Sequence, residues 1–62
     1  MKEKLICLCK AYKAIEQAQE QTNLIWEQNH LQTLKLDIDD MINDIITNTG
    51  DKYNDILKEY MY

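Results

Sequence analysis

An apolar stripe between residues 31 and 48 constrains the fold of this chain more than any other feature. Apolar side chains recur there at spacings of three and four, the rhythm of a helix with one apolar side. At about 100° per residue, all of them fall within about 60° of Ile38. The stripe consists of Leu31, Leu34, Ile38, Met41, Ile42 and Ile45. In a 62-residue chain, such a stripe must be covered by another helix, from the same chain or from a partner.

A second stripe precedes the first and predicts a helix from about residue 3 to about residue 29. Ala11 and Ala18 lie on its flank, where small side chains allow another helix to approach to about 8–10 Å. Gln19 and Thr22 interrupt the stripe with polar groups, which either fix the register of paired helices or mark a wetter part of the seam. The stripe consists of Leu5, Leu8, Tyr12, Ile15, Gln19, Thr22 and Trp26.

The two stripes differ in phase, so one straight helix would carry them on different sides. We therefore expect a turn near residues 28–30, with His30 in it, followed by a helix over about residues 31–48. Gly50, the only glycine of the chain, suits the left-handed residue that ends a helix. Helical spacing from Tyr53 to Tyr60 then predicts a short helix over about residues 52–61, or a kinked continuation of the second helix.

The composition favours an all-α protein, because proline and valine are absent and glycine occurs once. We predict an antiparallel helical hairpin with a short third C-terminal helix, forming one domain over residues 1–62. A core of this size rarely contributes more than about 3–5 kcal/mol, so we expect dimerisation or partner binding to complete it. The core positions that we predict are Leu8, Tyr12, Ile15, Leu34, Ile38, Met41 and Ile45.

In length and plan the chain resembles the two-helix hairpins that pair into four-helix bundles, such as the Rop family of plasmid copy-control proteins. The resemblance is architectural. No motif matches residue by residue, and the basic RNA-contact face of that family is not visible in this sequence.

We expect no catalytic, metal or cofactor site. Cys7 and Cys9 point about 160° apart on a helix, and only His30 could join them, whereas a zinc site needs about four ligands. We interpret both cysteines as free thiols. His30 has no serine, cysteine or carboxylate at an activating spacing. The acidic run that starts at Asp37 lacks the glycine and the distal glutamate of a calcium loop.

The charge is uneven along the chain. Residues 1–31 carry four Lys and four Glu, while residues 32–62 carry three Lys against six Asp and one Glu, so the net charge of −4 falls in the second part. No basic stripe is present for direct binding of nucleic acid. The longest uncharged apolar run, Leu5 to Cys9, is far shorter than the roughly 18 residues of a membrane span and too short for a signal peptide. We expect a cytoplasmic protein without membrane contact.

Acids form a row beside the apolar stripe. Each like-charge pair at i, i+3 or i, i+4 costs a few tenths of a kcal/mol, so a helix optimised for stability alone would place lysine between them. A partner with a basic surface, such as a nucleic-acid-binding protein, would meet this row; a solvated face is the alternative. The row consists of Asp37, Asp40 and Asp44, with Asp51 and Asp55 if the helix continues straight.

Bulky apolar residues form a second candidate partner surface. Leu24 and Leu36 point away from the stripes, while Ile25 lies at the edge of the first helix's stripe and Trp26 lies within it. We therefore predict a non-enzymatic regulator or inhibitor that binds another protein through helix faces and the acidic row. By size and charge it is similar to phage and mobile-element factors that act on host enzymes or defence proteins. The alternative is a structural self-assembly module, a four-helix-bundle homodimer without inhibitory activity.

Overall fold

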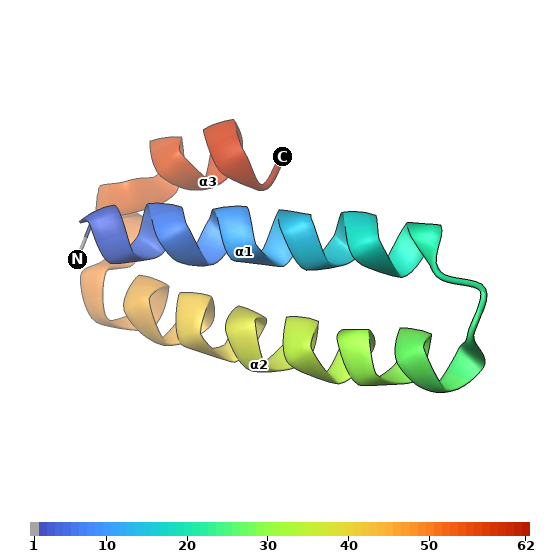
Figure 1. Cartoon of the computed structure of the whole chain (residues 1–62). Helices are drawn as coiled ribbons and strands as arrows, with labels where there is room; N and C mark the ends of the chain where they lie inside the picture. The colour runs from blue at the N-terminus through green and yellow to red at the C-terminus, as the bar shows by residue number, and fades with distance from the viewer. Residues whose placement is uncertain (1) are drawn as a thin grey trace.

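The computed structural model describes residues 2–62 and is all-α, as predicted. Three α-helices and one 3₁₀ turn follow one another, and no strand occurs within the described range. In Figure 1, α1 and α2 lie side by side and α3 lies along the first part of α1. The elements are α1 (Lys2–Gln21), α2 (Ile25–Thr49), η1 (Gly50–Tyr53) and α3 (Asn54–Tyr60).

Contacts between α1 and α2 define how the two helices are aligned. Glu16 faces Lys35, and three residues further along α1, Gln19 faces Gln32, three residues back along α2. Residue numbers therefore rise on one helix as they fall on the other, so the two helices run in opposite directions (Figure 1).

The break between α1 and α2 lies at residues 22–24, so the predicted turn near residues 28–30 is wrong. Thr22 and Asn23 are weak helix formers, and their local polar groups compete with the helix. The Leu24 backbone N–H donates to Thr22 Oγ1 at 3.3 Å, and Gln28 Nε2 donates to the Thr22 carbonyl at 2.8 Å. These bonds close the turn without glycine. The first predicted helix is therefore too long, and His30 lies within α2 rather than in a turn.

The buried core lies at the end of the molecule where α1, α2 and α3 meet. Of the predicted core positions, Ile45 is buried, while Leu8, Tyr12, Ile15 and Ile38 are half-buried. The buried apolar side chains of the described residues are Leu5, Cys9, Ile42, Ile45 and Ile56.

Leu34 and Met41 were wrongly predicted to be buried; they are 37% and 49% exposed. The side of α2 that faces α1 is centred closer to Ile42 than to Ile38. Leu34 and Met41 lie about 80° and about 100° around the helix from Ile42, at the far edge of the stripe.

Gly50 ends α2 and redirects the chain. Its φ of 64° and ψ of −134° lie in a region that favours glycine. Its N–H bonds to the Ile46 carbonyl, and the following η1 turn leads into α3, which packs back on α1 with Ile56 buried. A straight continuation of α2 is therefore wrong. Asp51 lies in η1 and Asp55 in α3, both beyond the bend, so they do not continue the helix that carries the α2 aspartates.

Candidate functional site

The side chains with catalytic or metal-binding potential are scattered over the molecule. Cys7 is exposed and Cys9 is buried, in agreement with their opposite directions on α1. Within residues 2–62, no three His, Cys, Asp or Glu side chains gather closely enough to hold a metal ion. In the same range no helix has the length and apolar character that a membrane crossing needs.

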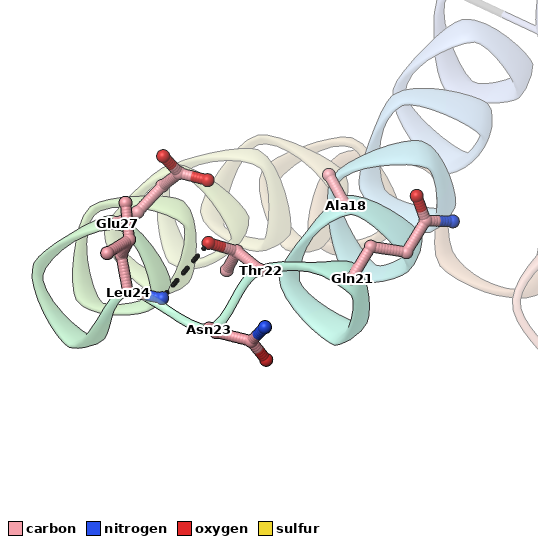
Figure 2. A pocket seen from close by; sticks show the side chains of 6 residues that line it. All are labelled: Ala18, Gln21, Thr22, Asn23, Leu24 and Glu27. Atoms are coloured by element: carbon pink, nitrogen blue, oxygen red, sulfur yellow. Dashed lines mark hydrogen bonds between the residues drawn. The ribbon is translucent and has the colours of Figure 1, made fainter.

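A shallow, open hollow lies beside the turn between α1 and α2. Figure 2 shows its lining, in which the Leu24 N–H bonds to Thr22 Oγ1 and Glu27 is the one titratable side chain. Glu27 therefore has no second acid–base side chain beside it in the lining. It is lined by Ala18, Gln21, Thr22, Asn23, Leu24 and Glu27.

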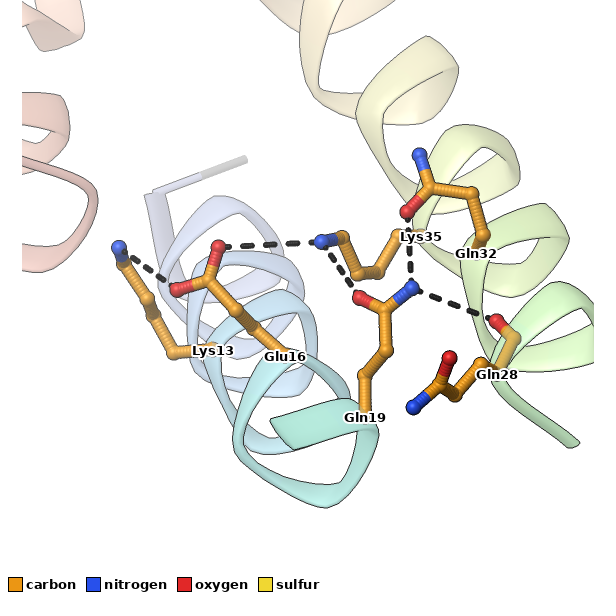
Figure 3. A network of polar contacts seen from close by, with 6 residues as sticks. All are labelled: Lys13, Glu16, Gln19, Gln28, Gln32 and Lys35. Atoms are coloured by element: carbon orange, nitrogen blue, oxygen red, sulfur yellow. Dashed lines mark hydrogen bonds and ion pairs between the residues drawn. The ribbon is translucent and has the colours of Figure 1, made fainter. Parts of the chain in front are cut away.

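A polar network joins α1 to α2 in the half of the seam that lies toward the turn (Figure 3). Lys35 Nζ donates to Gln19 Oε1 at 2.9 Å. Gln19 Nε2 donates in turn to Gln32 Oε1 at 3.0 Å and to the Gln28 carbonyl at 3.3 Å. The Gln19 amide therefore bonds on both its oxygen and its nitrogen, and a shift of one helix along the other would break these bonds.

The side chain of Lys35 packs into this seam, although α2 is an acidic helix. Its side chain is only 11% exposed, and its Nζ lies 3.8 Å from Glu16 Oε2 and 5.4 Å from the centre of the Tyr12 ring. Glu16 also pairs with Lys13 at 3.4 Å. The amine is thus held by a carboxylate, an amide oxygen and an aromatic face, all on α1.

The position of Lys35 leaves the outer side of α2 without a lysine or arginine. Between residues 25 and 49 the chain carries five carboxylates and one lysine, a net charge of −4, which equals the net charge of the whole chain. Asp37, Asp40 and Asp44 are all exposed. Each is three or four residues from the next, so the three carboxylates share one side of the helix.

Apolar side chains lie on the same side of α2 as these acids; Leu36 stands next to them, and Ile25 and Trp26 lie about three turns nearer to the start of the helix. Trp26 is 68% exposed and stands 18 residues, or five full turns, before Asp44, so both lie on the same line along α2. Ile25 and Leu36 are 75% and 55% exposed and lie together on the neighbouring line, next to Asp40. Leu24, 51% exposed, precedes the helix at the turn.

We call this surface the α2 outer face, and it occupies an arc of about 120° around the helix. Its residues are Ile25, Trp26, Leu36, Asp37, Asp40 and Asp44.

Trp26 was wrongly placed in the core stripe, because that placement assumed that the first helix continued through residue 26. The sequence reasoning also missed the role of Lys35, although its position within about 60° of Ile38 already placed it on the inward side.

No protein-family model, no curated protein and no solved structure matches this chain.

Proposed function

We propose that the protein is a non-enzymatic regulator or inhibitor that binds a protein with a basic surface through the α2 outer face. One observation carries this proposal. The net negative charge is concentrated on α2, and the one lysine of that helix is turned into the seam with α1, so the carboxylates of the outer face have no basic neighbour on their own helix.

This arrangement has an energetic cost that a partner would relieve. Each repulsion within the pairs Asp37–Asp40 and Asp40–Asp44 costs a few tenths of a kcal/mol in the free protein. A lysine- or arginine-rich surface would replace that repulsion with attraction and would accelerate association. Trp26, exposed on the same line, would add apolar burial, and tryptophan is among the residues that contribute most to interface affinity.

The partner class follows from the chemistry of this face. A basic surface large enough to meet a helix face is typical of proteins that bind nucleic acids, and the acidic row would compete with nucleic acid for that surface. Phage and mobile-element factors of similar size and charge block host enzymes or defence proteins. We propose the same kind of action here.

Capture of partners from a bacterial lysate, followed by titration of the purified partner, tests the proposal. Binding should be strong at about 0.1 M salt and weak at about 1 M salt, because the Debye length falls from about 10 Å to about 3 Å. The double variant Asp40→Asn/Asp44→Asn removes two charges from the α2 outer face. It should lower the affinity and reduce its dependence on salt, while the helical circular dichroism stays unchanged.

The matched control is Asp51→Asn/Asp55→Asn, which removes the same charge from residues beyond the Gly50 bend. This control should keep the wild-type affinity. Equal losses for both pairs would mean that only the total charge matters. Wild-type affinity in the Asp40/Asp44 variant at low salt would show that the acidic row is a solvated face.

A second candidate function is a structural self-assembly module, in which an antiparallel hairpin pairs with its copy and the acids serve solubility alone. The small core favours it, because only five apolar side chains are buried among the described residues. This candidate predicts that the Asp40/Asp44 variant has wild-type activity and an unchanged oligomeric state.

A further inference from the structure

One flank of the α1–α2 pair is turned away from α3. On α1, the side toward α3 is marked by Lys10, whose Nζ lies 5.7 Å from the centre of the Tyr60 ring, and by Ile6, which lies about 40° around the helix from Lys10. Ile15 follows Ile6 by nine residues and therefore lies about 180° around the helix from it. Leu8 and Ala11 share the side of Ile15, and all three are half-buried.

The matching flank of α2 carries two partly exposed apolar side chains. Leu34 and Met41 are seven residues apart and thus lie on the same side of the helix. They are 37% and 49% exposed. Ile46, which packs against the core with Ile56, lies more than about 100° around α2 from both of them. We call this apolar surface the open flank; it consists of Leu8, Ala11, Ile15, Leu34 and Met41. Lys4 and Glu27, seven residues before Ala11 and Leu34, lie at its two ends.

We infer that the open flank pairs with the open flank of a second copy of this chain, around a two-fold axis parallel to the helices. Such an axis places α1 of one copy against α2 of the other, with both turns at the same end. The inference specifies the pairing surface for the self-assembly named as the second candidate function. It concerns a different surface from the α2 outer face and does not depend on the binding of a basic partner.

The size of the molecule is compatible with this occupant. It measures 39 × 18 × 15 Å, so a whole side, of which the open flank is a part, covers roughly 600–700 Å² in projection. A stable interface of standard size buries about 800 Å² per partner. The small Ala11 side chain allows the close helix approach that four-helix packing needs.

The charges of the helices select the orientation. The range 2–21 carries four Lys and three Glu, a net charge of +1, whereas α2 carries −4. Pairing around the parallel axis puts each α2 beside an α1 of the other copy and keeps the two acidic helices on the diagonal. A two-fold axis that lies in the interface but runs perpendicular to the helices would put α2 of one copy directly against α2 of the other. Like-charge repulsion opposes that arrangement.

Light scattering after size exclusion, combined with thermal unfolding over about a hundredfold dilution, tests the pairing. The wild type should be a dimer with a midpoint that falls on dilution. Leu34→Lys/Met41→Lys should be monomeric with an unchanged helical spectrum, because both positions tolerate a solvated side chain in the single chain. The matched control Ile25→Lys/Leu36→Lys makes the same change outside the open flank and should remain dimeric.

A monomeric wild type with a midpoint independent of concentration would overturn the inference, as would a dimeric Leu34/Met41 variant. A spin label at Gln21→Cys, in a Cys7→Ser background that leaves only the buried Cys9, tests the orientation. Turns at the same end should give a distance well below the 39 Å length of the molecule; a distance near that length would contradict the parallel axis.

Discussion

Lys35 and Gln19 stand sixteen residues apart in the chain, yet a 2.9 Å hydrogen bond joins the amine of one to the amide oxygen of the other. This bond links α2 to α1 and also removes the one lysine of α2 from its solvent side. One interaction therefore contributes both to the alignment of the two helices and to the acidity of the α2 outer face.

Removing the Gln19 amide should destabilise the fold measurably. Gln19→Ala deletes the three hydrogen bonds that this side chain makes and leaves Lys35 with Glu16 alone among its polar partners. We expect the unfolding free energy to fall by about 1–2 kcal/mol, measured by urea denaturation at a fixed protein concentration. Gln17→Ala, at an exposed position of the same helix, is the control and should change it by less than about 0.5 kcal/mol. Equal effects would mean that the network contributes nothing specific.

Truncation of Ile42 should be the more costly of two matched isoleucine changes. Ile42 is 3% exposed and Ile25 is 75% exposed, although both lie on α2. Ile42→Ala should cost about 2–5 kcal/mol, because it leaves a cavity in the core. Ile25→Ala should cost less than about 0.5 kcal/mol. A loss below about 1 kcal/mol at Ile42 would contradict the position of the core.

Substitution of Gly50 tests the bend at the end of α2. A Cβ at this position would meet no atom within 4 Å, so the cost of Gly50→Ala arises from the backbone conformation alone. A φ of 64° with a ψ of −134° should cost an alanine about 1–3 kcal/mol. The control Thr47→Ala lies at an exposed position of the regular helix and should be neutral or slightly stabilising. A neutral Gly50→Ala would indicate that the chain does not bend in this way.

The two thiols should react at very different rates. Cys7 is exposed, whereas burial raises the pKa of Cys9 above its ordinary value of 9.0 and so reduces its thiolate fraction. One thiol per chain should therefore react rapidly with Ellman's reagent in the folded protein, and the second only on unfolding. Cys7→Ser should abolish the fast phase; a remaining fast phase would contradict the burial of Cys9.

The same raised pKa gives a direction for the pH dependence of stability. Below pH 9.0 both the folded and the unfolded states keep the Cys9 proton. Above that value the unfolded chain loses it first, so the free energy of unfolding should fall as the pH rises further. Urea denaturation of the wild type and of Cys9→Ala across that range measures the effect. The variant should lack the part of the decline that is due to Cys9.

Periodicity predicted the helical class and the inward direction of Ile45, because a regular repeat is a local property of the sequence. It did not locate the first break. Thr22 and Asn23 carry no strong stop signal, and the turn there depends on the Gln28 side chain, six residues beyond Thr22, reaching back to its carbonyl. Because the turn lies earlier in the chain than predicted, Trp26 lies on the outer surface and not in the expected core.

The predicted acidic row was correct only within α2. Asp37, Asp40 and Asp44 share a side through helical geometry alone, so the sequence was sufficient to group them. The position of Asp55 depends on the direction that the chain takes after Gly50. That direction follows from the packing of Ile56 against α1 and α2, a tertiary contact that no local repeat encodes.

The α1–α2 seam is apolar beside α3 and polar beside the turn. We therefore expect the two ends of the molecule to differ in the free energy of local opening. Backbone amides near Ile42 should exchange with deuterium only through global opening, whereas those around Gln19 and Gln28 should exchange through local fraying. Trp26 stands at the fraying end. A partner that binds there would slow deuterium uptake at the turn and leave the amides beside α3 unaffected, so the exchange pattern along α2 would report its occupancy.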